Sequence, residues 1–394
     1  MRVFIKNHHR ITVPQELLIV RLLTSIGFAT LITITSLFLQ DLGLSYSQVG
    51  LVTSTAYIAS FLAALALPAI LHRYNIEKVL VVSLLSFAGL LGIIGFSKTA
   101  LIAVALFLAS RVAIVVISSA ASILFKDDSG DKKSFYKYQS IAGSLSSFAW
   151  TITPFIAGIL LDSRSFSFTY AVGGFMTLLG AIYLLLYPVP VAYKKPTKSS
   201  FNIVANIRFF ISKKNLKDAF FMDAGANIWF GYLFTFVTLF MINEGYTNAD
   251  VGLFITLTQV PLFLLEFKAD VVIKYFGFRL PFFLSYGLMT AALLYSFFAS
   301  FSLLTLAALV IASIGMAFVE PGKEIFVYEG LDKTDEERAY PIYNTGSLIG
   351  SIVIRLISSA VIALFGFKYS FLAAALLVGY IAYKAYRIVD PNRG

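Results

Sequence analysis

Long apolar stretches dominate this chain and set the strongest constraint on its fold. A helix needs about 20 largely apolar residues to cross a hydrocarbon layer about 30 Å thick. About twelve stretches meet this condition, and their apolar residues run without the alternation that a membrane-spanning β-strand needs. The sequence therefore predicts an all-α membrane protein. The expected spans are residues 17–39, 48–71, 77–96, 99–124, 135–161, 168–188, 217–242, 249–273, 279–300, 302–328, 341–365 and 368–389.

The composition also indicates a protein that crosses the membrane many times. Hydrophobic residues make up 58% of the chain and charged residues 13%, with a mean hydropathy of +0.83, whereas a soluble chain carries about 25% charged residues. The net charge of +10 would suit nucleic acid if the cations shared one folded face. They occupy short loops between apolar stretches instead, so we expect a lipid bilayer as partner and no nucleic acid.

Lysine and arginine gather at one set of helix ends, and this asymmetry predicts the orientation. The opposite ends hold only Lys98, Arg164 and Lys368. Because cytoplasmic loops of membrane proteins carry an excess of these cations, we expect a protein of the cell membrane with both termini in the cytoplasm. An even number of spans independently places both termini on one side.

One short motif occurs twice in the chain. Residues 37–51 read LFLQDLGLSYSQVGL and residues 239–253 read LFMINEGYTNADVGL. In each copy a glycine suits the positive φ that often ends a helix. Ser45 in the first copy and Thr247 in the second can begin a capping box with the residue three positions on. Both copies therefore predict a tight link between two antiparallel helices.

The duplication predicts how the chain is divided. Gly50 and Gly252 lie about one turn inside the new helix and leave room for a neighbouring helix. Parallel repeats of six helices, related by an axis along the membrane normal, form two pseudo-symmetric bundles with a cavity between them. We expect an N-terminal bundle at residues 1–188, a cytoplasmic basic linker at 189–216 and a C-terminal bundle at 217–394.

With these features the chain resembles the major facilitator superfamily of transporters. The doubled link motif, the order of six plus six spans and the charge bias are all similar to that family. Arg111 follows Leu-Ala-Ser in the fourth span, as an arginine does in many proton-coupled members, and Thr153-Pro154 with Gly158 resembles an antiporter motif in the fifth. The resemblance implies a secondary active transporter that moves a small solute by alternating access, through proton-coupled export or antiport.

Two arginines inside the predicted spans are candidate binding residues. A lipid-exposed charge costs at least about 2.5–3.5 kcal/mol at mid-bilayer, so a charged side chain should face a cavity or a partner. Arg111 and Arg355 lie about halfway along the fourth and eleventh spans, and a guanidinium can grip a carboxylate or a phosphate. Each could instead hold neighbouring helices together through backbone carbonyls. An uptake permease for an organic anion is thus an alternative function.

Carboxylates inside the predicted spans are candidates for proton coupling. Glu320 is the first candidate, because a buried carboxyl can hold a proton near neutral pH; it could instead pair with Lys323, three residues on. Glu266 and Asp223 are further candidates. Arg21 and Asp223 occupy one position of the two halves and could pair between the bundles, or each could reach water along its own chain.

Large aromatic and amide side chains at mid-span depth could line a cavity with apolar walls and a few polar groups, although each alone is more often a packing residue. These candidates are Tyr57, Trp150, Asn227, Trp229 and Gln259.

Several function classes lack the residues they need. The chain has no cysteine and only three histidines, so we expect no metal, no cofactor and no enzyme activity. A sensor that binds a partner without transport is a second alternative, although its cytoplasmic loops should then carry an extra domain. We expect a monomer whose partners are a small-molecule substrate and a proton or another coupling ion.

Overall fold

The computed structural model is almost entirely helical in the part of the chain that it describes. Within that part, twelve helices are long and apolar enough to cross a membrane, and no strand is present. The predicted all-α architecture and its twelve spans are therefore confirmed. The described residues are 13–128, 132–188, 203–299, 302–329, 331 and 336–389.

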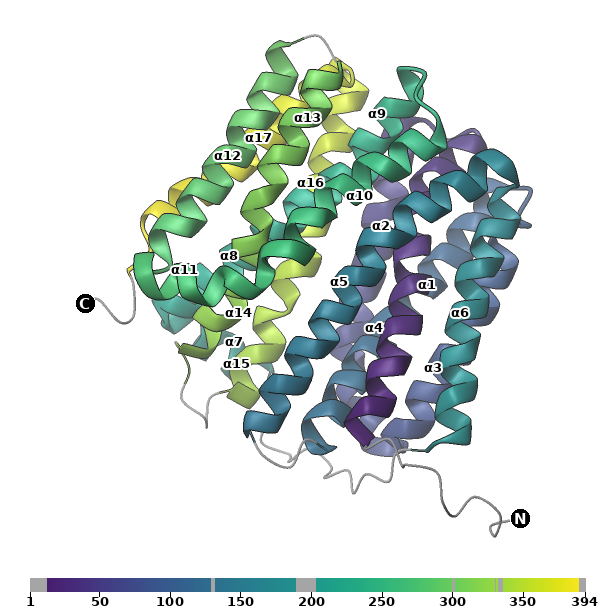
Figure 1. The fold of residues 1–394 in the computed structure, drawn as a ribbon, viewed down its shortest axis with the longest axis vertical. Coiled ribbons are helices and arrows are strands. Elements are labelled where there is room, and N and C mark those ends of the chain that lie inside the picture. The colour runs from purple at the N-terminus through teal and green to yellow at the C-terminus, as the bar shows by residue number, and fades with distance from the viewer. Residues whose placement is uncertain are drawn as a thin grey trace.

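The helices form two bundles of six spans each, one coloured from purple to teal and the other from teal through green to yellow in Figure 1. The first bundle contains α1 (Val13–Asp41), α2 (Tyr46–Arg73), α3 (Ile76–Ile94), α4 (Ala100–Asp128), α5 (Lys132–Ser163) and α6 (Phe166–Leu186). The second contains α8 (Lys214–Tyr232), η2 (Leu233–Val237), α9 (Thr238–Asn243), α10 (Asn248–Leu265), η3 (Glu266–Lys268), α11 (Ala269–Phe276), α12 (Arg279–Phe298), α13 (Leu303–Ala312), η4 (Ser313–Gly315), α14 (Met316–Glu329), α15 (Glu336–Tyr343), α16 (Thr345–Phe365) and α17 (Lys368–Tyr386).

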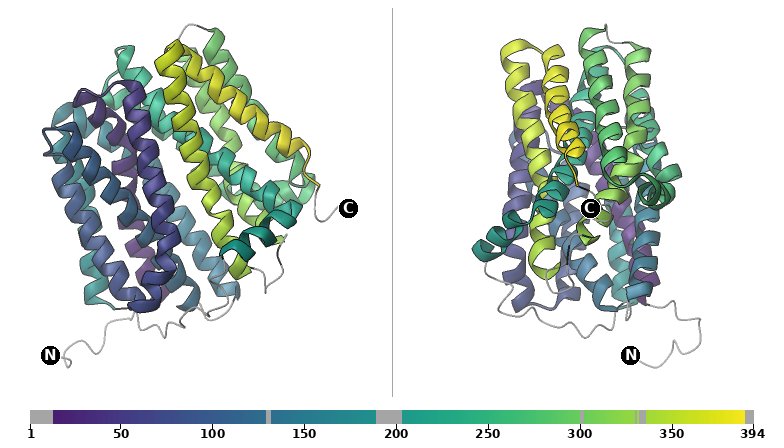
Figure 2. Two further views of the ribbon diagram at one scale, coloured as in Figure 1. Left: turned by 180° about the vertical axis from the view of Figure 1, so that it is seen from behind. Right: turned by 90° about the vertical axis from the view of Figure 1, so that its left-hand side faces the viewer.

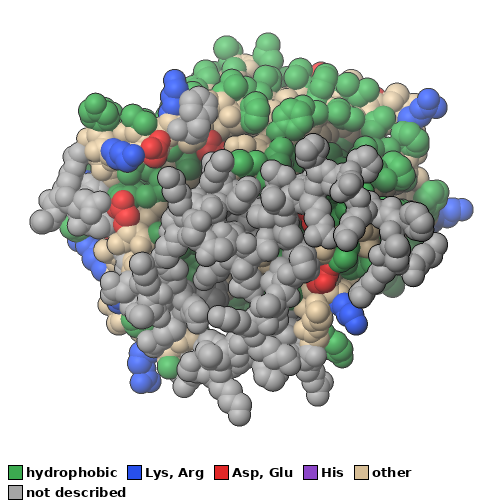
Figure 3. All heavy atoms as spheres, turned by 60° about the horizontal axis from the view of Figure 1, so that its bottom comes forward, with side chains coloured by type: hydrophobic (Ala, Val, Ile, Leu, Met, Phe, Trp, Pro, Cys, Tyr) green, Lys and Arg blue, Asp and Glu red, His purple; other side chains and the backbone are tan. Residues whose placement is uncertain are grey.

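A short helix, α7 (Ile203–Ser212), precedes the second bundle and packs against α8 and α15. It lies within the predicted linker, of which residues 189–202 are outside the described residues. The linker and the exact bundle boundaries stay predictions. We name the end of the molecule where α1 begins the termini end, and the opposite end, where α1 meets α2, the link end. Figure 3 looks onto the termini end, with blue lysine and arginine side chains around its edge.

Two helix pairs join the bundles, and the repeat relates them. Helix α2 packs along α16, and α10 packs along α5. In span order these pairs are the second with the eleventh and the eighth with the fifth, so exchanging the two halves of the chain converts one pair into the other. The two bundles stand side by side in Figure 2.

Both links have the geometry that the repeated motif predicts. Gly43 and Gly245 adopt φ values of 90° and 87°, a region that favours glycine because it has no Cβ. At the start of α2, the Ser45 amide donates to Gln48 Oε1 at 2.8 Å. At the start of α10, Thr247 and Asp250 form the same reciprocal capping box.

The second glycine of each motif lies where a helix of the other bundle comes closest. A Cβ on Gly50 of α2 would clash with Ser359 Oγ and would lie 2.7 Å from Phe236. A Cβ on Gly252 of α10 would clash with the Pro154 carbonyl of α5. Both sites therefore need a residue without a side chain, as the sequence predicts.

An acidic side chain fastens the bundles together at the link end. The Asp162 carboxylate, at the end of α5, accepts hydrogen bonds from the Asn248 amide at 3.2 Å, from Asn248 Nδ2 at 2.8 Å and from the Ala249 amide at 2.8 Å. A carboxylate at this place satisfies the open N–H groups of α10 and complements the positive end of its dipole. The Tyr46 hydroxyl adds a 2.7 Å bond to Asn243 Oδ1.

We expect Asp162→Ala to open the link end, because it removes charge-assisted hydrogen bonds worth about 1.5–3 kcal/mol each. The chain has no cysteine, so Ser54→Cys supplies a single thiol; Ser54 is fully buried and its hydroxyl donates to the Ile352 carbonyl across the bundles. Labelling by a water-soluble thiol reagent should rise about tenfold or more. Asp41→Ala, an exposed acid at the same end, is the control, and equal labelling in both variants would contradict the role of Asp162.

Candidate substrate site

Two arginines from opposite bundles lie against one tyrosine ring. The guanidinium carbon of Arg111 (α4) is 4.0 Å from the Tyr57 ring centroid, and that of Arg355 (α16) is 4.3 Å from the same centroid. Tyr57 belongs to α2, so the ring and Arg111 are part of the first bundle and Arg355 is part of the second. The cluster therefore crosses the boundary between the bundles.

The cluster lies near the middle of the membrane. Tyr57, Arg111 and Arg355 are each ten or eleven residues from the link end of their helices. At 1.5 Å per residue this depth is about 15 Å, or half of a hydrocarbon layer about 30 Å thick. The sequence placed both arginines at this depth, and the structure brings them to the same ring.

The lack of a side chain at Gly231 leaves room for the Arg355 guanidinium between closely packed helices. A Cβ on Gly231 of α8 would lie 2.7 Å from Arg355 Nη1 and 2.9 Å from the Ile354 side chain. Arg355 Nη1 donates to the carbonyl of Ser351, one turn earlier in its own helix, at 3.0 Å. Arg355 is only 3% exposed and Arg111 only 7%.

The two guanidinium charges have no carboxylate partner among the residues that the structure describes. Ion pairs of the described residues include those of Lys274 with Asp270 and of Lys323 with Asp223 and Glu320, and neither Arg111 nor Arg355 belongs to them. The Nε atoms of Arg111 and Arg355 are both buried without a hydrogen-bond partner. Contact with an aromatic face stabilises a desolvated cation by about 2 kcal/mol, which is less than the several kcal/mol that burying one charge costs. The arrangement thus has the donors and the positive charge to hold an anion.

A second charged cluster lies wholly within the second bundle. Lys323 Nζ of α14 is 2.8 Å from Asp223 Oδ1 of α8 and 2.9 Å from Glu320 on its own helix. Asp223 Oδ2 is buried without a hydrogen-bond partner, whereas the Glu320 side chain is 26% exposed. Two carboxylates share one ammonium, so this cluster has a charge of −1 when all three groups are ionised.

Glu324, the next acid along α14, is held by two tyrosines of α15. The Tyr340 and Tyr343 hydroxyls each donate to its carboxylate at 3.1 Å.

Helix α14 continues through Pro321, and the departure from α-helical geometry comes earlier, at η4.

The pair between Arg21 and Asp223, one of the two alternatives for these residues, is not formed. Arg21 Nε donates to Ser146 Oγ of α5 at 3.0 Å, and Asp223 is paired with Lys323. The reason lies in η2, a π-helical turn, because such a turn holds about one residue more than α-helix and rotates the preceding residues by about 100° about the axis. The offset that aligns the two links therefore does not hold for Asp223.

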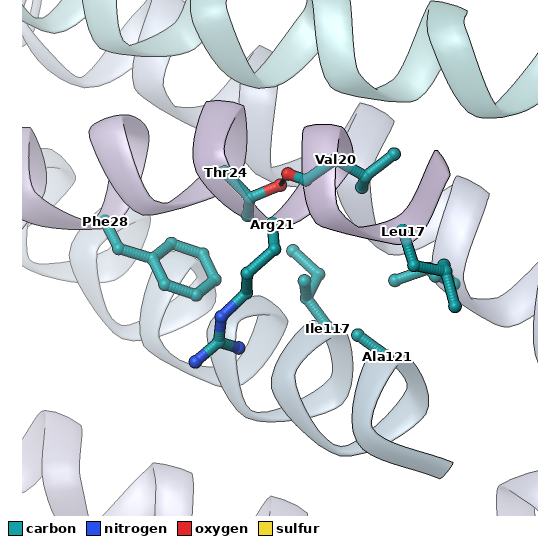
Figure 4. Close-up of a pocket in the computed structure, with 8 residues that line it drawn as sticks. Leu17, Val20, Arg21, Thr24, Phe28, Ile117 and Ala121 are labelled. Carbon is teal, nitrogen blue, oxygen red and sulfur yellow. Dashed lines mark hydrogen bonds between the residues drawn. The ribbon is translucent and has the colours of Figure 1, made fainter. Parts of the chain in front are cut away.

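Arg21 also borders a small cavity beside Phe28, with Ile117 and Ala121 of α4 alongside (Figure 4). The volume of this cavity is about 10 Å³, which is room for about one water molecule. It is too small to hold a solute.

Glu266 makes a further contact between the bundles. Its Oε2 accepts a hydrogen bond from Ser147 Oγ of α5 at 3.1 Å. Because Ser146 next to it accepts from Arg21, two successive serines of α5 contact an arginine of one bundle and a carboxylate of the other.

The other predicted cavity residues contact neighbouring helices or residues of their own helix. Trp229 is fully buried in the hydrophobic core, with its indole N–H unpartnered. Trp150 packs edge-on against Phe234 at 5.8 Å. Asn227 donates to the Asp223 carbonyl at 3.0 Å, and buried Gln259 donates to Thr258 Oγ1 at 3.4 Å. None of these contacts involves Arg111 or Arg355.

Sequence reasoning missed three residues that shape these sites. Lys323 was recognised as a partner of Glu320 but not of Asp223, 100 residues away in the chain. The space at Gly231 and the carboxylate of Asp162 were also not singled out. A small residue opposite a membrane arginine, and an acid beside the first turn of a helix, are the signals that could have found them.

Comparison with known proteins shows the family to which this chain belongs. The sequence model of the Major Facilitator Superfamily matches residues 17–260 and 231–392, and the chain belongs to this family. No curated protein sequence matched it. It is a membrane transport protein, and twelve helices in its described part are long and apolar enough to span the membrane.

Solved structures of similar fold include transporters of different solutes. The nucleoside transporter NupG has a TM-score of 0.73 at 14% identity, over 96% of this chain and 100% of its own. The D-xylose-proton symporter has a TM-score of 0.76 at 12% identity, over 97% and 98%. The human organic anion transporter MFSD10 (TETRAN) has a TM-score of 0.70 at 14% identity, over 95% and 98%. At these identities the likeness concerns the fold alone.

The two charged clusters should respond oppositely to loss of their cation. Arg355→Gln removes one of two neighbouring buried charges, so we expect a thermal unfolding temperature equal to or a few degrees above that of the parent. Lys323→Gln leaves two carboxylates without their cation and should lower stability by about 3–5 kcal/mol. Thermal unfolding in detergent measures both. If Arg355→Gln were as destabilising as Lys323→Gln, the packing of Arg355 against Tyr57 of α2 and Gly231 of α8 would be stabilising the fold, and the arginine would be a structural residue.

Proposed function

We propose that this protein is a secondary transporter of a small organic anion, which binds between Arg111 and Arg355. The observation that carries the proposal is the pair of buried guanidinium groups on one tyrosine ring, without a carboxylate partner in the described part of the chain. A planar guanidinium fork matches a carboxylate or a phosphate with two parallel hydrogen bonds. An anion would therefore supply both the missing charge and the missing acceptors.

The position of the two arginines also suggests how binding is linked to movement. Each bundle contributes one cation, so a bound anion connects the bundles through charge-assisted bonds to both. Without the anion, two like charges in a low-dielectric interior oppose the approach of the bundles. The loaded carrier should thus pass through its closed state more easily than the empty one. This difference favours exchange of one anion for another.

The contacts at the link end suggest which side of the carrier is accessible. Asp162 and Tyr46 join the bundles at that end. We infer that this structure is the state closed at the link end, in which substrate enters and leaves at the termini end. The cation bias predicts that this end faces the cytoplasm.

Location in the cell membrane, the monomeric state and the lack of catalytic activity stay predictions.

Replacing either arginine by glutamine should abolish anion transport. A hydrogen bond to a charged group contributes about 1.5–3 kcal/mol, so each variant should bind the anion about 10- to 150-fold more weakly. The measurement is exchange of labelled succinate, benzoate, lactate and inorganic phosphate by proteoliposomes, with xylose and uridine as neutral probes. Arg208→Gln, which removes an exposed arginine of α7, is the matched control. Unchanged anion flux in both Arg111→Gln and Arg355→Gln would overturn the proposal.

The same vesicles separate the competing functions. An exchanger needs anion on the far side of the membrane, whereas an uptake permease also moves anion into empty vesicles. A sensor without transport gives no flux of any probe, although it should still bind its ligand.

A second candidate property is coupling to protons, carried by the cluster of Asp223, Lys323 and Glu320. One proton would neutralise this cluster, and Glu320 is its partly exposed member. Lys323 is already paired with buried Asp223, so loss of the Glu320 charge leaves the ammonium one partner. We therefore propose Glu320 as the proton carrier, with Asp223 as its partner and Glu266 as the next candidate.

Glu320→Gln should keep exchange of anion between equal pH values and lose accumulation driven by a pH gradient, because an amide does not titrate. Counterflow and gradient-driven uptake in the same proteoliposomes measure the two activities. Asp270→Asn, an exposed acid that is also paired with a lysine, is the control. Accumulation that persists in Glu320→Gln but is lost in Glu266→Gln would move the role to Glu266.

A further inference from the structure

A groove of about 420 Å³ runs along the surface of the second bundle between α12 and α17. These helices lie side by side at the edge of the molecule farthest from the first bundle (Figures 1 and 2). The groove is bordered by Phe283, Gly287, Thr290, Gly379, Ala382, Tyr383 and Tyr386. Nearly all of these side chains are apolar or aromatic, and the groove is remote from the arginine pair.

Two glycines form the floor of this groove. A Cβ on Gly287 would meet no atom within 4 Å, so the space above it is open. Gly379 on α17 is half-buried, and a Cβ there would lie 3.3 Å from the Thr290 side chain. The volume is within the range of about 300–1,000 Å³ that is usual for small-molecule sites, and its walls suit a hydrocarbon chain.

Two arginines stand at the termini end of the groove, each held by one of its tyrosines. The guanidinium carbon of Arg279, the first residue of α12, lies 4.3 Å from the Tyr386 ring centroid. Arg387 Nη1, just after α17, donates to the Tyr383 hydroxyl at 3.0 Å. Both arginines are exposed. The tyrosines therefore orient two cations at the level where the spans end.

We propose that this groove binds one anionic phospholipid, with its phosphate at Arg279 and Arg387 and one acyl chain over Gly287 and Gly379. An apolar channel that ends at two cations matches the two parts of such a lipid, and tyrosines at this level are typical of the membrane interface. Basic clusters between spans on the cytoplasmic side are known to bind acidic headgroups. The site is separate from the proposed substrate site, so either proposal can fail without the other.

Native mass spectrometry of the whole protein in detergent tests the proposal. The probes are phosphatidylglycerol and phosphatidylcholine with the same acyl chains. The parent protein should bind phosphatidylglycerol about 30-fold more tightly, because two basic residues near an anionic headgroup together contribute about 2 kcal/mol. The double variant Arg279→Gln/Arg387→Gln should bring the two affinities together. Gly287→Leu should fill the groove and weaken both lipids.

Matched controls keep the same chemistry at other places. Arg208→Gln removes an exposed arginine of α7, and Gly89→Leu adds the same side chain at an open position of α3; both should bind lipid as the parent does. Thermal unfolding confirms that each variant is folded. The proposal is overturned if the lipid preference survives the double arginine variant, if Gly287→Leu binds as the parent does, or if a protein dimer forms that Gly287→Leu disrupts.

Discussion

The approach of α2 to α16 determines where the substrate site can be. Gly50 lets the two helices touch near the link end, and from there they run along each other to mid-membrane, where Tyr57 of one meets Arg355 of the other. Arg111 reaches the same ring from α4, which packs on the other flank of α2. A site formed in this way belongs to neither bundle. It is complete only while the bundles are in contact, and that dependence is the physical basis of the proposed transport.

The two charged clusters differ in whether their charges are balanced, and the proposed roles depend on this difference. Two carboxylates of the same bundle balance the charge of Lys323. Breaking a buried pair of this kind costs several kcal/mol. The charges of Arg111 and Arg355 are balanced by nothing in the described residues and lie on elements that belong to different bundles. A balanced cluster can move as part of a rigid body, whereas an unbalanced pair changes energy whenever the distance between its members changes.

Much of the fold could be predicted from the sequence because membrane helices are specified by local properties. Length and hydropathy predicted all twelve spans, and the doubled motif with Gly43 and Gly245 predicted both links. The depth of Arg111 and Arg355 followed from counting residues along straight helices. Their meeting at Tyr57 did not, because it depends on how each helix is rotated and tilted about its neighbours.

The remaining site features depend on a local change of helix geometry or on contacts between spans that are distant in the chain. One π-helical turn at η2 was enough to invalidate the alignment of Arg21 with Asp223, and no pattern in the sequence marks that turn. The partnership of Asp223 with Lys323 joins spans that are distant in the chain. The bond from Asp162 to the start of α10 likewise crosses from one bundle to the other. Such contacts become visible only when the packing of the helices is known.

The division of the site between the bundles has one more consequence, which concerns ligand size. Tyr57 and Arg111 travel together, and Arg355 moves separately. A ligand too short to reach both guanidinium groups would stay with one bundle and could not hold the other in place. A ligand with two acidic groups at a suitable spacing, or with one acidic group whose oxygen atoms point in two directions, could bind both guanidinium groups. The carrier would then select ligands by length, with a lower limit set by the separation of the two guanidinium groups.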